Sequence, residues 1–165
     1  MRISIWVAVV SSSSHRVLLA RRAPTTRNAG QWNFFGGGMD PGERPMKTAI
    51  RELKEEAGIA ATRRDLVELG ETTTSAKRNI LFGMMVDDEF VPSLNGESTH
   101  WEWVAVMGLE QRHDLHMPTS LLLGCLSGWL AQFPRLTSVV VESEDEDSTS
   151  EDRLPRLLEW SPQRN

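Results

Sequence analysis

The sequence predicts an α/β domain with a mixed β-sheet, and three observations support this fold class. Segments rich in β-branched and aromatic residues recur along the first hundred residues, as strands do. Two other segments carry apolar residues at the three- and four-residue spacing of helices. The chain has 165 residues, enough for one sizeable core. Strands interleaved with helices in mixed order imply helices packed on a mixed sheet.

Six segments are expected to be strands because they combine β-branched and aromatic residues with polar turns at their ends. They are residues 3–10, 17–20, 32–35, 66–74, 80–86 and 101–106, and residues 139–141 form either a last strand or the start of the tail. The run at residues 3–10 follows Arg2 and loosely resembles a signal peptide. It is short and leads directly into the next strand, so a strand is favoured there.

Two helices are expected. From Pro45 to Ala57 the apolar residues fall on one helical face. Pro45 suits the first turn of this helix, and Gly58 suits the position just after its end. The second helix begins at Pro118 and continues to about Phe133. It is apolar on most sides, which predicts that it is well buried.

The acidity of the chain is confined to its C-terminal segment. Residues 142–165 hold eight acidic and three basic residues and so carry the whole formal charge of −5, while residues 1–141 are balanced. A neutral body excludes a strongly basic nucleic-acid-binding domain. The organisation expected is a domain over residues 1–141 and an acidic, disordered tail over residues 142–165, with a leucine-rich segment at 153–160 that could form a short helix. A solubilising role for this tail is favoured over recruitment of a basic protein partner.

Composition also bears on the cellular location. No stretch of about 18 apolar residues is present, so no membrane-spanning helix is expected. The single cysteine, Cys125, makes no intrachain disulfide and is expected to be a small buried apolar residue. A cytoplasmic location is the expectation that follows, and the sequence does not indicate an oligomeric state.

Glu52, Glu55 and Glu56 form the most informative group of charged residues. They stand at positions i, i+3 and i+4 of the first helix and therefore share one face. Their mutual repulsion destabilises an isolated helix by about 0.2–0.5 kcal/mol per pair. A hard divalent cation, Mg²⁺ or Mn²⁺, would offset this repulsion and bridge to substrate phosphates. Taken alone, however, the pattern is more typical of a solvated acidic face balanced by Arg51 and Lys54.

The surrounding residues reverse that interpretation. Gly37, then Glu43 after five residues, then Arg-Glu-Leu-Lys-Glu-Glu-Ala-Gly-Ile at residues 51–59 fill the defining positions of a 23-residue motif. This segment resembles the Nudix box, and the likeness to MutT-like Nudix hydrolases extends over roughly residues 3 to 133. The resemblance implies an α/β/α sandwich with a mixed sheet and a catalytic loop–helix–loop.

The resemblance also implies roles for single residues. The three helix carboxylates, Glu52, Glu55 and Glu56, resemble the metal-binding glutamates, and the carbonyl of Gly36 resembles a further ligand. Arg51 is implied to orient this cluster, and Glu43 to pair with Arg51 and tie the loop to the helix. Phe35 is a departure, since the family commonly has proline there. This changes the loop or the wall of the base pocket but removes no ligand.

A further carboxylate from outside the box is expected. Glu97 is favoured as a ligand or as the general base because it lies six residues before Trp103, a spacing found in MutT-like members and RNA pyrophosphohydrolases. Glu52 remains a rival for the general base. Four other acidic residues compete with Glu97: Asp87, Asp88, Glu89 and Glu102.

The family hydrolyses a nucleoside diphosphate linked to another group. Arg21 and Arg22 are expected to bind phosphates, and Trp32 and Phe34 to stack on the base, with core packing as the alternative for the aromatic residues. The chain has no tyrosine and no proline between the box and Pro92, so markers of two subfamilies are missing. By elimination, a (deoxy)nucleoside triphosphate is favoured, cleaved to the monophosphate and pyrophosphate. The 5′-triphosphate end of RNA comes second, and a module that binds a nucleotide or a partner without hydrolysis comes third.

Overall fold

The computed structural model describes residues 1–133. Its elements in chain order are β1 (Arg2–Ser11), β2 (Arg16–Arg22), β3 (Trp32–Asn33), β4 (Phe35–Gly38), α1 (Pro45–Ala57), β5 (Leu66–Thr73), β6 (Lys77–Val86), β7 (Ser98–Ala105), the 3₁₀ helix η1 (Leu109–Gln111) and α2 (Met117–Leu130). The predicted strand at 139–141, the tail at 142–165 and the helix at 153–160 lie outside the described residues. Between residues 1 and 133, no helix is long and apolar enough to cross a membrane.

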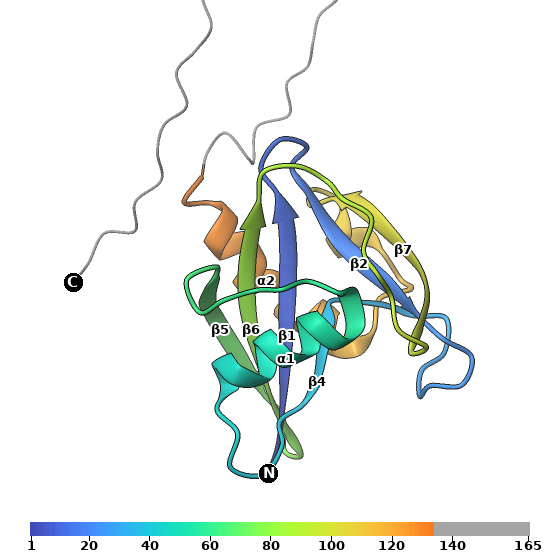
Figure 1. The fold of residues 1–165 in the computed structure, drawn as a ribbon, viewed down its shortest axis with the longest axis vertical. Coiled ribbons are helices and arrows are strands. Elements are labelled where there is room, and N and C mark those ends of the chain that lie inside the picture. The colour runs from blue at the N-terminus through green and yellow to red at the C-terminus, as the bar shows by residue number, and fades with distance from the viewer. Residues whose placement is uncertain (134–165) are drawn as a thin grey trace, which may run out of the picture.

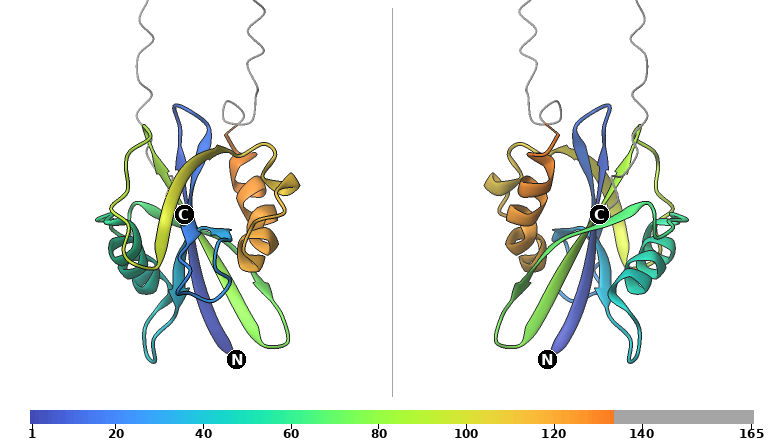
Figure 2. Two further views of the ribbon diagram at one scale, coloured as in Figure 1. Left: turned by 90° about the vertical axis from the view of Figure 1, so that its right-hand side faces the viewer. Right: turned by 90° about the vertical axis from the view of Figure 1, so that its left-hand side faces the viewer.

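The seven strands form one mixed sheet, with β1 at its centre. β1 pairs in parallel with β6 and antiparallel with β2 and β4. β5 lies outside β6, and β7 pairs with β2. The two long helices cover opposite faces of this sheet, α1 on one and α2 on the other (Figures 1 and 2). The predicted α/β/α sandwich is therefore confirmed.

The central strand is apolar along its length because both of its faces are covered. Ile5, Val7 and Val9 belong to the core under α1. Trp6, Ala8 and Val10 alternate with them and belong to the core under α2. A strand buried on both faces reads as a continuous apolar run, which explains the signal-peptide-like appearance of this segment.

The two helices differ in how well the sequence predicts their ends. α1 spans the predicted residues, with Pro45 in its first turn and Gly58 in the left-handed conformation at φ 68° after its last. α2 ends at Leu130 rather than at about Phe133. The amides of Gln132 and Phe133 bond three residues back, to Trp129 and Leu130, so the chain closes with a tighter turn. Proline at 134 disfavours a helical Phe133.

The glycine run after the third strand is the main departure from the predicted fold. A single strand at 32–35 ending at the glycines was expected, but the chain changes partners at Phe34. β3 pairs with β2, whereas β4 contains Gly36, Gly37 and Gly38 and pairs with β1. Gly36 has φ 143°, and a Cβ there would lie 2.0 Å from the carbonyl oxygen of Ile5. Glycine therefore permits this strand instead of ending it.

Two later strands begin three residues earlier than predicted. β6 begins at Lys77 because the amide of Thr74 bonds the Lys77 carbonyl at 2.8 Å and closes a short hairpin. β7 begins at Ser98, three residues before the predicted start, because its exposed polar residues pair with β2. The prediction of a strand relies on apolar residues that alternate with polar ones. The polar first residues of β6 and β7 do not alternate in this way, so they gave no strand signal.

Replacing Gly36 with alanine tests the role of the close approach between β4 and β1. Gly36→Ala is expected to lower the free energy of unfolding by at least about 2 kcal/mol, because its methyl group collides with backbone. Gly38→Ala is the matched control, since a Cβ there meets no atom within 4 Å. Denaturant unfolding measures both variants. Equal stabilities would contradict this account of β4.

Candidate active site

Two glutamates of α1 lie against the glycine strand β4. The Gly36 amide donates a 2.7 Å hydrogen bond to Oε2 of Glu56. A Cβ on Gly37 would lie only 2.7 Å from Oε1 of Glu52. Both glutamates are buried, with Glu52 8% and Glu56 7% exposed. Glycine at positions 36 and 37 thus leaves room for two carboxylates beneath the helix.

Burial makes these carboxylates hard to ionise. It raises the pKa of Glu56 to about 8, and the charges of Glu52 and Glu97 add to this effect, while the hydrogen bond from Gly36 opposes it. Burial also raises the pKa of Glu52, where Arg51 opposes it. Two adjacent buried carboxylates with too little positive charge nearby form a site that favours an added cation.

Arg51 connects the loop before α1 to the carboxylates on the helix. Its Nε and Nη2 donate to Glu43 at 3.2 and 3.1 Å, and its Nη1 donates to Glu52 at 2.9 Å. The hydrogen bond from Arg51 lowers the pKa of Glu43 to about 2, helped by the Thr48 hydroxyl, although burial opposes the shift. The pairing of Glu43 with Arg51 that the resemblance implied is present in the structure.

Glu55 is placed differently from the other two helix glutamates. Its side chain is 54% exposed and accepts a 3.1 Å bond from Nη1 of Arg51. Within residues 1–133, no three acidic, histidine or cysteine side chains are assembled as a ready-made metal site. The donor chemistry nevertheless fits a hard divalent ion at Glu52 and Glu56, where buried carboxylate oxygens lack a compensating charge. The ligand roles predicted for Glu55 and for the Gly36 carbonyl remain predictions.

The loop between β6 and β7, residues 87–97, is fastened to the end of α1 and to β7. The Ser93 amide donates to the Ala57 carbonyl at 2.9 Å. The indole Nε1 of Trp103 donates to the Phe90 carbonyl at 3.0 Å, and the two rings meet edge to face with centroids 5.5 Å apart. These contacts fix the loop against the C-terminal end of α1 and against β7.

Glu97 lies at the end of this loop. Its carbonyl accepts a 2.8 Å bond from the Ala23 amide, and its side chain is exposed. Its charge raises the pKa of both Glu52 and Glu56, so Glu97 lies within electrostatic reach of the buried pair. Two competitors have other partners, since Glu102 pairs with Arg112 and Glu89 with an arginine of β2. The role of Glu97 as a metal ligand or general base remains a prediction.

The residues predicted to contact substrate are divided between the two faces of the sheet. The charge of Arg22 lowers the pKa of Glu56, so Arg22 lies within electrostatic reach of the site, while Arg21 is exposed and bonds the Gly30 carbonyl. Trp32 packs against the core under α2, with Arg112 5.3 Å from its ring centre. The prediction for Phe34 is wrong. Its side chain is 0% exposed in that same core, which leaves no surface for a base.

The sequence interpretation missed one polar residue on the α1 face. Asn33 is 3% exposed, and its Oδ1 has no hydrogen-bond partner. It pairs in register with Ala20, which pairs on its other side with Trp101, so the three side chains share one face of the sheet. Trp101 is 37% exposed. The only signal in the sequence was a polar residue inside an aromatic strand.

The family model described as the NUDIX domain matches residues 1–121. The chain belongs to the Nudix family. A crystal structure of a Nudix hydrolase from M. smegmatis has a TM-score of 0.63 and 22% identity, and the match covers 81% of this chain and 86% of that one. At that identity the likeness shows the fold alone. Phe35, at the position where the resemblance implied proline, is buried in the core under α1.

Three bacterial relatives are similar to this Nudix protein in sequence. The 8-oxo-dGTP diphosphatase of Escherichia coli K12 is 27% identical over 108 residues, which cover 66% of this chain and 84% of the relative. The CTP pyrophosphohydrolase of the same strain is 36% identical over 74 residues, 45% of this chain and 50% of the relative. The RNA pyrophosphohydrolase of Pseudomonas putida is 32% identical over 104 residues, 63% of this chain and 61% of the relative. The chain thus spans only half of the CTP pyrophosphohydrolase.

The raised pKa of Glu56 predicts how the stability of the metal-free protein depends on pH. A carboxyl whose pKa is about 8 in the folded state and 4.5 in the unfolded state stabilises the folded protein. This stabilisation is complete below pH 4.5 and is lost as the pH rises to about 8. Stability is expected to fall over this range by at most roughly 1.4 kcal/mol per pH unit. Glu56→Gln should remove this slope while keeping the bond from Gly36.

Glu43→Gln provides the control for this titration. The pKa of Glu43 is lowered to about 2, so its contribution is complete above the unfolded value and is lost only as pH falls towards 2. The variant is expected to be less stable throughout, with the slope between pH 5 and 8 unchanged. Urea unfolding in the presence of a chelator measures both variants. A Glu56→Gln protein with the wild-type slope would refute the assignment.

Proposed function

We propose that this Nudix protein hydrolyses a phosphoanhydride bond of a (deoxy)nucleoside triphosphate, giving the monophosphate and pyrophosphate. The observation that carries the proposal is the pair of buried carboxylates, Glu52 and Glu56, held against the backbone of β4 with raised pKa values. Such a pair favours a divalent cation, which the polyphosphate of a nucleotide also requires. The named pyrophosphohydrolase relatives support the same reaction class.

The residues of the site are assigned roles by this proposal. The proposed ligands of Mg²⁺ or Mn²⁺ are the carboxylates of Glu52, Glu55, Glu56 and Glu97 and the carbonyl oxygen of Gly36. The bound ion neutralises phosphate charge and lowers the pKa of water. Arg51 fixes Glu52 through its 2.9 Å bond and so sets the geometry of the cluster.

Proton transfer and phosphate binding need residues that solvent and substrate reach. Glu97 is exposed and within electrostatic reach of the buried pair, and it is favoured as the general base, with Glu52 as its rival. Arg22, within electrostatic reach of Glu56, binds a phosphate group, and Arg21 extends this positive charge.

The nucleoside side of the site is proposed along the row Asn33, Ala20 and Trp101. The exposed ring of Trp101 offers a face on which a base stacks. The unpartnered Oδ1 of Asn33 offers an acceptor for a base N–H, and a buried acceptor gains when it is paired. Ala20 is small, so the space between them is not filled by its side chain.

A phosphate-release screen with Mg²⁺ and with Mn²⁺ tests the proposal. Its substrates are ordinary and oxidised nucleoside triphosphates, nucleotide sugars, dinucleoside polyphosphates and triphosphorylated RNA. Glu56→Gln is expected to lower kcat by about three orders of magnitude while the protein stays folded. Glu68→Gln, on β5 and away from the carboxylate pair, is the control and should retain activity.

The pattern of turnover separates the alternatives. Faster turnover of triphosphorylated RNA than of any free nucleotide would favour the activity of the RNA pyrophosphohydrolase relative. Nucleotide binding by calorimetry without release of any phosphate product would favour a binding module without hydrolysis. Full activity of Glu56→Gln would exclude the proposed site.

Trp103 tests whether the loop that carries Glu97 must be held in place. Trp103→Leu removes the bond to the Phe90 carbonyl and the ring contact, so kcat is expected to fall about 10- to 100-fold with a smaller change in KM. Trp103→Phe keeps an aromatic ring, and its kcat should lie between those of the wild type and Trp103→Leu. Trp129→Leu, a half-buried tryptophan of α2, is the control for lost packing. An equal loss of kcat in that variant would reduce the Trp103 effect to general destabilisation.

A further inference from the structure

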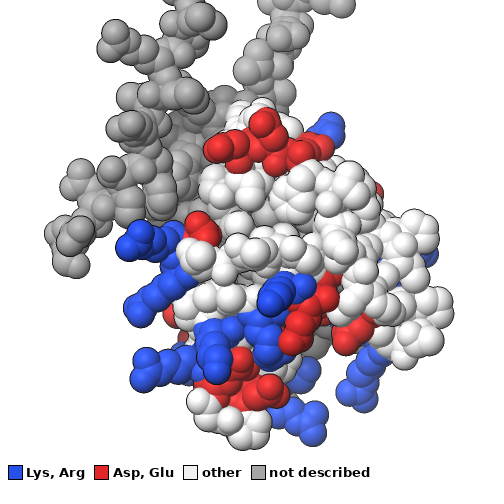
Figure 3. Space-filling model, in the orientation of Figure 1, with Lys and Arg blue, Asp and Glu red and all other residues white. Residues whose placement is uncertain are grey.

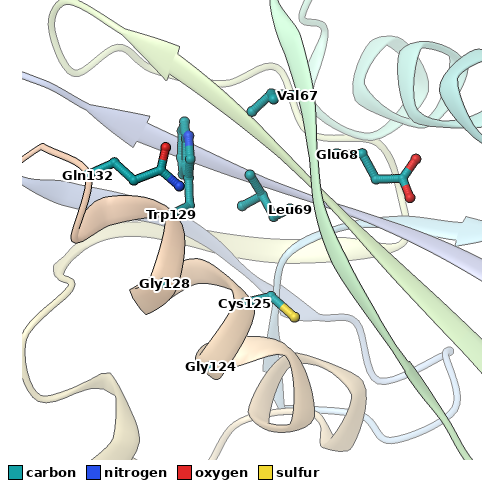
Figure 4. Close-up of a pocket in the computed structure, with 8 residues that line it drawn as sticks. All are labelled: Val67, Glu68, Leu69, Gly124, Cys125, Gly128, Trp129 and Gln132. Carbon is teal, nitrogen blue, oxygen red and sulfur yellow. The ribbon is translucent and has the colours of Figure 1, made fainter.

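Two grooves flank β5, the outer strand of the sheet beyond β6. The first, here the α2 groove, has a volume of about 340 Å³ and is lined by Val67, Glu68, Leu69, Gly124, Cys125, Gly128, Trp129 and Gln132 (Figure 4). The second, here the α1 groove, has a volume of about 480 Å³ and is lined by Arg44, Pro45, Met46, Lys47, Ile50, Arg63, Glu68 and Phe82. Glu68 borders both grooves, so together they form a path around the edge of the sheet.

The α2 groove has both apolar and polar lining residues and begins where the described chain ends. Val67 is 45% exposed, and Leu69 and the indole of Trp129 are half-buried beside it. Glu68 points away from Trp129 (Figure 4). The helix side of the groove is open because Gly124 and Gly128 have no side chains and nothing lies within 4 Å of the Cβ positions. Gln132, in its lining, directly precedes the last described residue.

The α1 groove is basic around an apolar floor. Met46, Ile50 and Phe82 form the floor, while Arg44 and Lys47 with Arg63 supply positive charge. None of these three cations has an ion-pair partner among residues 1–133. Lysine and arginine gather over α1 and the segment after it (Figure 3). Neither Glu52 nor Glu56 lines this groove, so the buried carboxylate pair does not account for it.

We propose that the two grooves bind residues 134–152 of the same chain. Residues 139–141 are three consecutive valines, which match the apolar side chains of the α2 groove, Val67, Leu69 and Trp129. Residues 142–152 contain seven acidic residues and no basic residue, which match the cations of the α1 groove. From residue 133 to residue 142 an extended chain spans roughly 30 Å, about the diameter of a small domain. The apolar and acidic segments thus follow in the order in which the chain meets the two grooves.

Charge explains why the chain's own tail is the occupant. Residues 1–141 balance to zero, but three cations of the α1 groove are unpaired within the described part, while the tail carries the whole charge of −5. A covalently attached segment binds at a high effective concentration, so modest contacts suffice. Ion pairs at an exposed groove are screened by salt, so binding should weaken as ionic strength rises.

Carbodiimide cross-linking of the full-length protein tests the proposal, since it joins a lysine amine to a carboxylate only where the two touch. The chain has three lysines, Lys47 in the α1 groove, Lys54 further along α1, and Lys77 at the start of β6. At low protein concentration, Lys47 is expected to couple to acids within 142–152 at least about fivefold more than Lys77 does. In 1 M salt this difference should disappear.

Charge reversal at the other groove cations supplies the matched comparison. Arg44→Glu/Arg63→Glu keeps Lys47 as the reporter and should reduce its coupling to the tail about fivefold. Arg2→Glu/Arg16→Glu makes the same charge change outside the grooves and should leave the coupling unchanged. Circular dichroism checks that both double variants are folded.

Three results would overturn the proposal. Equal coupling of Lys47 and Lys77 would show that the acidic segment does not bind the α1 groove. Products that join two chains and grow with protein concentration would assign the grooves to a second copy. Tight binding of a single-stranded oligonucleotide by Arg44 and Arg63, without tail cross-links, would assign the α1 groove to nucleic acid.

Discussion

The site depends on the close contact between α1 and the glycine strand β4. The Gly36 amide bonds Glu56 at 2.7 Å, and the Glu52 carboxylate occupies the place where a side chain of residue 37 would be. The same glycine lets β4 approach β1, where any Cβ would collide with Ile5. One short strand therefore joins the centre of the sheet to α1. Its lack of side chains is what permits two buried carboxylates.

The two buried glutamates differ in how much positive charge lies near them. Arg51 reaches Glu52 but is shared with Glu43, whose pKa it lowers to about 2. Glu56 lacks such a partner and has its pKa raised to about 8 by burial. An ionised Glu56 therefore lacks a compensating positive charge, and this costs stability unless a cation binds. A deficit of this kind is typical of functional sites rather than of structural ion pairs.

The sequence predicted the fold class, the first helix and the positions of Glu52 and Glu56, because helical periodicity and a long spaced motif fix these directly. It did not predict that Glu55 turns towards Arg51, since i, i+3 and i+4 spacing leaves side-chain rotamers open. Phe34 was misplaced and Asn33 was missed for another reason. Which face of a strand a residue occupies depends on pairing register, and the change of partners at Phe34 is a tertiary feature. The basic groove beside β5 was also hidden, because its cations come from the residue before α1, from α1 itself and from the loop after it.

The central claim is that a divalent cation binds at Glu52 and Glu56 and takes the place of a proton on Glu56. Calorimetric titration with Mn²⁺ at pH 7, repeated in two buffers of different ionisation enthalpy, measures the protons released on binding. The wild-type protein is expected to release about one proton per ion bound, because Glu56 is mostly protonated at that pH. Glu56→Gln is expected to bind far more weakly. Binding without proton release, or with the same affinity in Glu56→Gln, would contradict the claim.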